Sequence, residues 1–306
     1  MNVLSLFDGM SCGQIALNRI GVKYDKYFAS EIKENAIKVT QYNYPNTIQL
    51  GSVVNVKAHD LPKIDLLIGG SPCQDLSQAN KERTGLDGLK SSLFFEYFRL
   101  YEELKPTYFL LENVSMSDED YMIISEMVGT EPVRINSSLV SGQLRDRFYW
   151  TNIGEGHYDL FGNRKCDIPL PKNKNIQLSD IIENGFVDRQ KSRALLESDS
   201  RPLRTPVKMF HRYYSIGFTT LVFKDQETYI KMVEMYNNGK HKDPIFHPDN
   251  LRYLHQTELE KLQTVPKGYT GILKRDEAAS LLGDGWTVDV IAHIFRSIAQ
   301  EERKAV

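Results

Sequence analysis

Apolar and polar residues alternate along the first 155 residues in a pattern typical of strands that take turns with helices. Short apolar runs between turn residues predict strands, and apolar positions that recur every three to four residues predict helices. The strands are expected at residues 3–7, 27–30, 64–68, 107–111 and 147–152, and the helices at 14–19, 33–42, 92–104 and 118–128. This alternation predicts a parallel sheet with helices on both faces.

The pattern breaks after Ile153. From there to Lys267 the chain is richer in Pro, Asn, Lys and Arg, and its clearest strand-like piece is 219–223. Helical spacing returns at 257–263 and again at 288–302. We therefore predict an α/β domain over 1–155, to which 275–306 return, and a smaller irregular domain over 156–274.

Charge is unevenly distributed along the chain, although the net charge is only −2. Residues 156–267 contain 18 Lys and Arg against 14 Asp and Glu, a net charge of +4 that leaves −6 for the rest. Between Arg189 and Arg212 there are seven basic residues and two acidic ones. Such an excess is typical of a segment that follows a phosphate backbone, but a solvated loop explains it equally well.

Cysteine and histidine usage indicates neither disulfides nor a metal site. Cys12, Cys73 and Cys166 are too widely spaced for a disulfide framework or a CxxC site, and the seven histidines lack ligand spacing. The apolar runs are too short to cross a bilayer, and the N-terminus has no secretory signal. We expect a cytoplasmic protein with free thiols, no bound metal and no membrane partner.

A glycine-containing turn over residues 7–13 joins the first predicted strand to the first helix. Such turns let the backbone approach a ligand closely, and the start of a helix offers N–H groups. The turn is not GxGxxG, which disfavours a nicotinamide cofactor, and Glu31 ends the next strand, where acidic side chains commonly bind ribose hydroxyls. A tight turn without a ligand is the alternative interpretation.

Three further segments carry candidate chemistry. Cys73 follows a buried strand and the stiffening Pro72, and its thiolate would be a strong nucleophile, although a buried structural cysteine fits as well. Glu112 ends the next apolar strand, where it could serve as a general acid or simply face solvent. Gln143, Arg145 and Arg147 would point to one side of an extended segment, which a salt-bridged strand would also explain.

Taken together, Phe-Asp-Gly, Pro-Cys-Gln, Glu-Asn-Val and Gln-x-Arg-x-Arg resemble, in this order, the motifs of the DNA cytosine-5 methyltransferases. Residues 252–266 and the Gly-Asp-Gly-Trp run at 283–286 extend the resemblance over nearly the whole chain. The wording is most similar to the animal de novo enzymes. The length is that of a compact bacterial or phage enzyme, so we expect no regulatory module.

The resemblance implies an α/β fold: a Rossmann-like mixed-sheet methyltransferase domain with a smaller, irregular target-recognition domain. It also implies that Cys73 attacks C6 of a flipped-out cytosine and that Glu112 supplies a proton at N3. In this scheme Arg145 binds O2, with Arg147 as a further partner, and Pro72 shapes the loop that carries the nucleophile.

The implied cofactor is S-adenosyl-L-methionine. The resemblance assigns its binding to Phe7, Asp8, Gly9, Met10, Ser11, Cys12, Glu31, Ile32, Ser52, Val53 and Trp286. Ser52 is a departure, because related enzymes usually have an acidic residue there. Thr264 and Val265 replace a Gly-Phe pair, and His255 replaces a Thr, in a segment that supports the recognition domain.

The implied partner is double-stranded DNA, and a companion restriction endonuclease remains open. The residues expected to contact DNA are Arg83, Gln143, Arg201, Arg204, Lys208 and Arg212. Arg83 belongs to a loop after Cys73 that would close over the base. Thr220-Leu221 resembles a pair often found in recognition domains. The base sequence that such a domain would read does not follow from the chain.

Three alternatives stay open. A catalytically silent DNA-binding relative is disfavoured by the presence of Cys73, Glu112 and Arg145. An RNA cytosine-5 methyltransferase would resemble relatives with a Cys-Phe-Thr-like segment, which this sequence lacks. A small-molecule methyltransferase on the same sheet would have no use for the basic stretch between Arg189 and Arg212.

Overall fold

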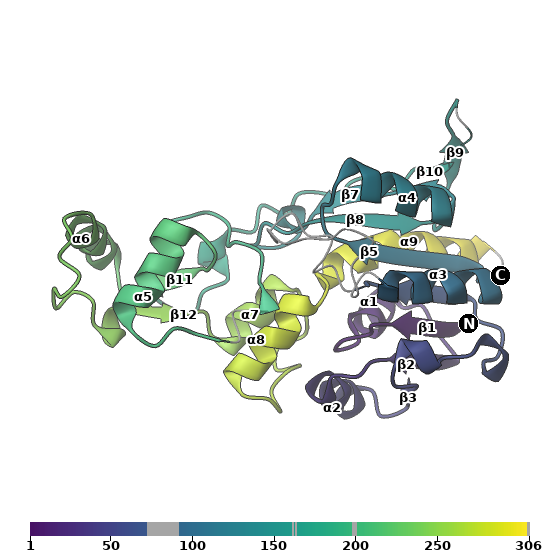
Figure 1. The fold of residues 1–306 in the computed structure, drawn as a ribbon, viewed down its shortest axis with the longest axis horizontal. Coiled ribbons are helices and arrows are strands. Elements are labelled where there is room, and N and C mark those ends of the chain that lie inside the picture. Colours follow the sequence, from purple (N-terminus) through teal and green to yellow (C-terminus); the bar gives the residue numbers. More distant parts are fainter. Residues whose placement is uncertain (72–91, 161, 163, 198–200, 305–306) are drawn as a thin grey trace. The chain divides into compact units, whose positions relative to one another are not determined.

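The computed structural model describes residues 1–71, 92–160, 162, 164–197 and 201–304. Pro72, Cys73 and Arg83 lie outside the described residues. The chain forms two compact units (Figure 1). Unit 1 consists of Met1–Asn136, Asp146–Pro171 and Val288–Val306, and unit 2 of Ser137–Arg145 and Lys172–Thr287.

Unit 1 is built on a seven-stranded sheet. Its strands are β1 (Asn2–Leu6), β2 (Lys26–Ser30), β3 (Ile48–Gln49), β4 (Leu66–Gly69), β5 (Tyr108–Asn113), β7 (Val133–Asn136) and β8 (Asp146–Thr151). They lie in the order β3-β2-β1-β4-β5-β8-β7. Five strands are parallel, and β8 runs antiparallel to both β5 and β7. The predicted mixed-sheet α/β fold is confirmed.

Helices cover both faces of this sheet (Figure 1). They are α1 (Cys12–Ile20), α2 (Glu34–Asn43), α3 (Ser92–Leu104), α4 (Asp118–Val128) and α9 (Val288–Lys304), and the 3-10 turns are η1 (Val53–Asn55) and η2 (Ala58–Asp60). Leu67 of β4 shares a core with Tyr97 of α3 and Ile124 of α4. Ile68 points the other way, because side chains alternate along a strand, and lies against α1, which packs on α9.

The start of α1 depends on a close approach to the sheet. The Ile68 side chain and the Tyr27 hydroxyl occupy the place where a Cβ on Gly13 would sit. Glycine at this position therefore lets the first turn of α1 lie directly on the sheet, beside the end of β1. The helix ends at Gly21, whose left-handed conformation lets its N–H bond back to Asn18, as the sequence predicted.

A second small sheet belongs to unit 1, although the predicted domain boundary at 155 placed two of its three strands in the other domain. It consists of β6 (Thr130–Glu131), β9 (Gly156–Tyr158) and β10 (Arg164–Cys166). Because β10 pairs with β6, residues 156–171 join unit 1. Residues 137–145 and 275–287 belong to unit 2 instead, so the boundaries differ from those expected at 155 and 275.

Unit 2 has a core of its own. Its regular elements are α5 (Pro206–His211), α6 (Gln226–Asn237), α7 (Gln256–Leu262), α8 (Arg275–Asp284), β11 (Leu221–Phe223) and β12 (Leu251–Tyr253), with 3-10 turns η4 (Ser137–Leu139), η5 (Leu178–Asp180) and η8 (Pro248–Asn250) and a π-helical turn η7 (Arg212–Ile216). Phe210, Tyr213, Phe223 and Met232 form the centre of this core. Of these elements, the sequence predicted only β11, from the strand-like piece at 219–223, and α7.

The helix α6 shows why the pattern failed in unit 2. Asp225 caps it by accepting a hydrogen bond from the Thr228 N–H at 2.7 Å. Only Thr228 and Met232 of its twelve residues are buried, which is too narrow an apolar stripe to detect in the sequence. No helix in the described part of the chain is both long and apolar enough to span a bilayer.

Candidate functional site

The carboxyl ends of four strands meet at one edge of the unit 1 sheet. Leu6, the last residue of β1, pairs with Ser30 of β2 and with Gly69 of β4, and Gly69 in turn pairs with Leu111 of β5. The residues that follow these positions therefore emerge side by side. Ligands of open α/β sheets bind at such an edge.

Asp8 lies buried beneath the loop that follows β1. Its carboxylate accepts hydrogen bonds from the Tyr27 hydroxyl at 2.8 Å and from the Ser11 hydroxyl. Desolvation by burial raises the pKa of Asp8 to about 6, against the hydrogen bonds from Ser11, Ser5 and Tyr27, which lower it. The Asp8 side chain is therefore engaged by hydroxyl groups within the loop and on β2, and its contact with a cofactor stays a prediction.

Glu31 fixes the same loop from the end of β2. One carboxylate oxygen accepts the Gly9 N–H at 2.8 Å, and the other accepts the N–H groups of Ile32 at 2.7 Å and Lys33 at 2.8 Å. A carboxylate oxygen can accept two hydrogen bonds, so the oxygen that binds Gly9 keeps capacity for a further donor such as a ribose hydroxyl. Nothing lies within 4 Å of the position that a side chain on Gly9 would take.

The other predicted cofactor residues divide by exposure. Met10, Ser11, Cys12 and Val53 are buried. These residues therefore support the loop through their backbones and core contacts. The remaining candidates keep exposed surface: Phe7 and Ser52 are half-buried, and Ile32 is exposed. Trp286 is half-buried in unit 2 and follows α8.

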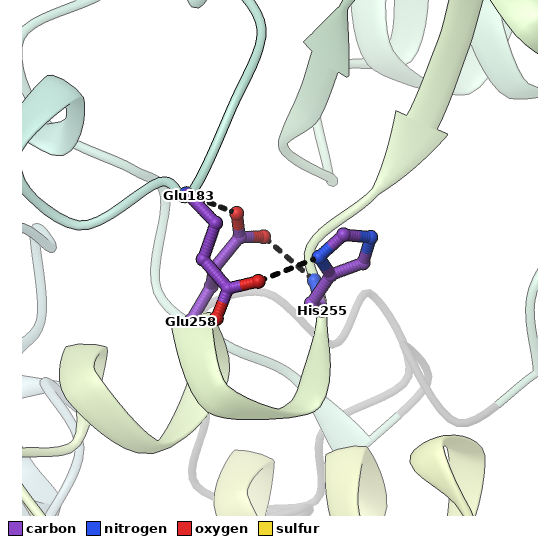
Figure 2. Close-up of side chains that lie close together, drawn as sticks. All are labelled: Glu183, His255 and Glu258. Atoms are coloured by element: carbon purple, nitrogen blue, oxygen red, sulfur yellow. Dashed lines mark hydrogen bonds and ion pairs between the residues drawn. The ribbon is translucent and has the colours of Figure 1, made fainter. Parts of the chain in front are cut away.

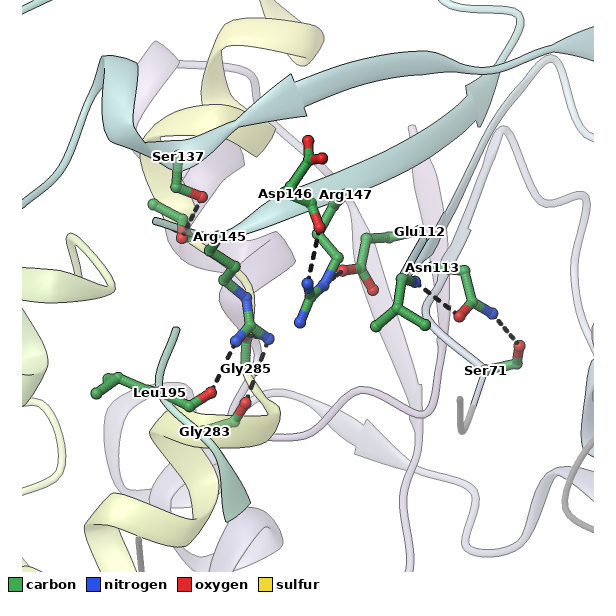
Figure 3. A network of polar contacts seen from close by, with 12 residues as sticks. Ser71, Glu112, Asn113, Ser137, Arg145, Asp146, Arg147, Leu195, Gly283 and Gly285 are labelled. Carbon is green, nitrogen blue, oxygen red and sulfur yellow. Dashed lines mark hydrogen bonds and ion pairs between the residues drawn. The ribbon is translucent and has the colours of Figure 1, made fainter. Parts of the chain in front are cut away.

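Glu112 forms an ion pair with Arg147 at the end of β5, between Oε1 and Nε at 2.9 Å (Figure 3). In the register of β5 and β8, Glu112 faces Tyr149, so Arg147 is its diagonal neighbour on the same face. Beside it, the Asn113 amide donates to the Ser71 hydroxyl at 3.2 Å. Asn113, which the sequence did not single out, thus joins β5 to the last described residue before Pro72.

The Gln-x-Arg-x-Arg segment does not form one extended face. Only Arg147 lies in β8, whereas Gln143 and Arg145 belong to unit 2. The Arg145 guanidinium donates to the carbonyls of Leu195 at 3.1 Å, Gly283 at 3.2 Å and Gly285 at 3.0 Å (Figure 3). Arg147, which had been the secondary candidate, is the arginine that pairs with Glu112.

Gln143 is fully buried, which contradicts its expected contact with DNA. Its amide nitrogen donates to the Leu262 carbonyl and to the Gln263 side chain, both at 2.8 Å, and its oxygen accepts the Leu195 N–H at 3.3 Å. These internal hydrogen bonds satisfy the amide in the place of an external partner. Gln143 therefore has a structural role within unit 2.

The basic stretch is on the surface of unit 2. Arg201, Arg204 and Lys208 are exposed, and Arg212 is half-buried in the π-helical turn η7. Arg201 forms an ion pair of 3.0 Å with Glu197, four residues earlier in the sequence. Such exposed pairs are weak, so the arginine can exchange this partner for a phosphate at little cost.

Glu183, His255 and Glu258 form the one group of possible metal ligands found among the described residues (Figure 2). Glu258 is fully buried and already saturated: Arg252 binds both its oxygens at 2.8 Å, and the N–H groups of Glu183 and His255 donate to it at 2.7 Å. Burial alone raises the pKa of Glu258, but these bonds hold it below its ordinary value. The group ties the start of α7 to the preceding strand.

Comparisons with known proteins agree on one family. Residues 1–120 match the model of the C-5 cytosine-specific DNA methylases. The chain is 28% identical over 266 residues to the orphan methyltransferase M.Rho11sI of Bacillus phage rho11s, covering 80% of this chain and 50% of that protein. It is 36% identical over 199 residues to the type II methyltransferase M.NgoBV of Neisseria gonorrhoeae, covering 60% of this chain and 46% of that protein.

The chain therefore spans about half the length of these curated relatives. The fold is also similar to that of the methyltransferase EhMeth from Entamoeba histolytica. The TM-score is 0.69 and the identity 15%, over 98% of both chains. At this identity the likeness supports the fold, and the sequence match supports the family.

The buried Asp8 predicts a pH dependence of stability. Its folded pKa of about 6 lies above the value of 3.8 for the free side chain, so its contribution to stability is full below pH 3.8 and is lost as the pH rises through about 6. Relative to Asp8→Asn, the wild type should lose roughly 2–3 kcal/mol of unfolding free energy between pH 4 and pH 7. Denaturant titrations of both proteins measure this difference, and a constant offset would contradict it.

The Glu258 cluster predicts a structural role without metal. Glu258→Ala leaves Arg252 and two backbone N–H groups without their acceptor, which should lower the unfolding free energy by roughly 3–5 kcal/mol. Glu183→Ala is the control and should have a much smaller effect, because that side chain is exposed. Thermal unfolding of the wild type should not respond to EDTA; a chelator-dependent Tm would instead indicate a bound ion.

Proposed function

We propose that the chain transfers a methyl group from S-adenosylmethionine to C5 of cytosine in double-stranded DNA, because residues 1–120 match the model of the C-5 cytosine-specific DNA methylases. The observation that carries the proposal is the Glu112–Arg147 pair at the sheet edge. It lies on the strand next to the one that leads, through Ser71, to Pro72 and Cys73.

The residues at the sheet edge fit S-adenosylmethionine, which supplies the methyl group. Glu31 keeps acceptor capacity for a ribose hydroxyl, and the space beside Gly9 leaves room for a ligand along the loop. Ser52 and Ile32 would line the adenosine side. Asp8 would act indirectly, by holding the loop in its conformation through Ser11. Trp286 remains a predicted contact.

The chemistry requires a nucleophile and an acid, because C5 of cytosine is itself a poor nucleophile. The Cys73 thiolate would add to C6 while Glu112 donates a proton to N3, which would make C5 nucleophilic toward the methyl group that S-adenosylmethionine supplies, leaving S-adenosylhomocysteine. N3 would then return its proton to Glu112, the C5 proton would leave to solvent, and the bond between Cys73 and C6 would break, which restores the ring and the thiolate. Since these atoms are covered in a duplex, the base must be flipped out.

Arg147 would hold the Glu112 carboxyl group toward the base through its 2.9 Å ion pair. It also donates to the Asp146 carbonyl at 2.8 Å, which fixes its side chain along β8. A pairing of this kind preorganises the acid before the base arrives. Arg145 would act indirectly, within unit 2, where its guanidinium donates to the carbonyls of Gly283 and Gly285.

Unit 2 would then serve as the target-recognition domain, a role that we predicted for residues 156–274. Arg201, Arg204 and Lys208 are exposed and suited to phosphate contacts, which position a protein on DNA without reading its sequence. Base-edge contacts in the major groove would supply specificity. RNA as the substrate, or a silent site, are the outcomes against which the proposal is tested.

The first test replaces the nucleophile. Cys73→Ser should abolish methyl transfer to DNA and retain S-adenosylmethionine binding, because a hydroxyl is a much weaker nucleophile than a thiolate. Cys166→Ser is the matched control, since Cys166 is half-buried against Arg164 and Thr151, and it should stay active.

The same assay distinguishes the alternatives. A duplex containing 5-fluorocytosine should trap a covalent adduct with the wild type and none with Cys73→Ser. Equal activity of Cys73→Ser and the wild type would overturn the mechanism. Transfer to RNA in place of duplex DNA would overturn the proposed substrate, and no transfer by the wild type would favour the silent relative.

A second test addresses the acid. Glu112→Gln keeps the shape of the side chain but cannot supply the proton, so the single-turnover rate should fall by roughly 10²–10⁴. Glu131→Gln is the control; Glu131 lies in the same unit and binds the Tyr121 hydroxyl at 2.6 Å, away from the strand ends. A Glu112→Gln rate within a few-fold of the wild type would show that another group activates the ring.

A further inference from the structure

We propose that a small cavity in unit 2, lined by Arg193, binds one phosphate group of the DNA backbone; this inference rests on the proposed DNA substrate. The cavity is formed by residues 193–195 and 218–220, by Tyr253, Leu254 and Leu259, and by Arg275. Its volume of about 10 Å³ admits one water-sized group, such as a phosphate oxygen. Arg193 belongs to the basic stretch between Arg189 and Arg212, but it was not among the residues expected to contact DNA.

Among the described residues, no acid forms an ion pair with the Arg193 guanidinium. Within the described residues, no acid and no carbonyl accepts a hydrogen bond from its guanidinium. Burial, together with the nearby Arg189, lowers the pKa of Arg193. An anion bound in the cavity would relieve both effects, because it would accept the guanidinium N–H groups and offset the repulsion.

The neighbouring arginines differ from Arg193 in this respect. Arg189 is paired with Asp188 at 2.9 Å and lies over the Tyr213 ring at 4.5 Å. Arg275 is paired with Asp276 at 3.0 Å and donates to the Leu254 carbonyl at 3.1 Å. Of these three arginines, Arg193 is thus the one that no acid pairs with among the described residues, and Arg275 adds positive potential at the wall of the cavity.

The backbone holds Arg193 in position. Its N–H donates to the Thr220 hydroxyl at 3.2 Å, which anchors the residue to the start of β11. Its guanidinium lies against Gly217, where any Cβ would collide with Nη1. Gly217 also has a φ of +84°, a conformation that other residues rarely adopt. Glycine at 217 therefore leaves the space that the guanidinium occupies.

The surroundings favour a nucleic-acid phosphate over a small free anion. The cavity takes one oxygen atom and not a whole small molecule. Phe218 at its rim is 47% exposed and Ile216, two residues earlier, is 51% exposed, so the rim is open to solvent. The exposed Arg204 and Lys208 precede Phe218 in the sequence. A phosphate backbone could contact these two side chains as well as Arg193.

The test compares DNA binding by the wild type, Arg193→Gln, Arg193→Lys and Lys231→Gln. Lys231 is an exposed residue of α6, so its variant controls for the loss of one charge in the same unit. Arg193→Gln should weaken binding to a DNA duplex roughly tenfold or more. It should also reduce the slope of log K against log salt concentration by about 0.9, the value for one lost phosphate contact. Lys231→Gln should match the wild type.

Arg193→Lys separates charge from fold. It should keep the salt slope of the wild type, because the cation remains, and S-adenosylmethionine affinity should be unchanged in all variants. Superimposed curves for Arg193→Gln and the wild type, or equal loss of slope in Arg193→Gln and Arg193→Lys, would overturn the phosphate site alone. A wild type that binds no duplex would overturn the DNA substrate as well. Inorganic phosphate could instead raise the unfolding temperature of the wild type but not of Arg193→Gln, while both proteins bind DNA equally well. That result would indicate a site for a free anion.

Discussion

The antiparallel pairing of β8 with β5 is the constraint on which the candidate site depends. A strand that ran parallel to β5 would bring its last residues to this edge, so Arg147, which is near the start of β8, would lie at the opposite edge. Because β8 returns in the opposite direction, its first residues reach the carboxyl end of β5, and Arg147 becomes the diagonal neighbour of Glu112. The ion pair is therefore a consequence of strand direction. Arg145, the residue before β8, belongs to unit 2.

Two buried carboxylates show how hydrogen bonding decides the consequence of burial. Glu258 receives four hydrogen bonds from Arg252 and two backbone N–H groups, and its pKa is lowered although it is fully buried. Asp8 receives hydroxyl hydrogen bonds without a cation, and its pKa is raised. The first carboxylate therefore stabilises unit 2, whereas the second costs stability at neutral pH in order to hold a loop at the strand ends.

The sequence predicted most of unit 1 and little of unit 2, for a physical reason. In unit 1 the apolar runs and helical stripes are wide, because strands and helices bury whole faces against a large sheet; α3 and α4 were predicted with the bounds that they have. In unit 2 the core is a cluster of aromatic side chains from short elements, such as Phe210 and Tyr213. A six-residue helix or a three-residue strand leaves no periodic signal.

The sequence by itself carried the resemblance: motif order and residue type pointed to one family, and they singled out Glu112 and Glu31 at strand ends. Tertiary structure decided which side chains can act there. The spacing of Gln143, Arg145 and Arg147 suggested one face, but spacing cannot show where a strand begins. The fold divides the three between two units, buries Gln143 and brings Arg147 to Glu112. Among the described residues it likewise pairs no acid with Arg193, because pairing between charges depends on contacts across the fold and not on their order in the chain.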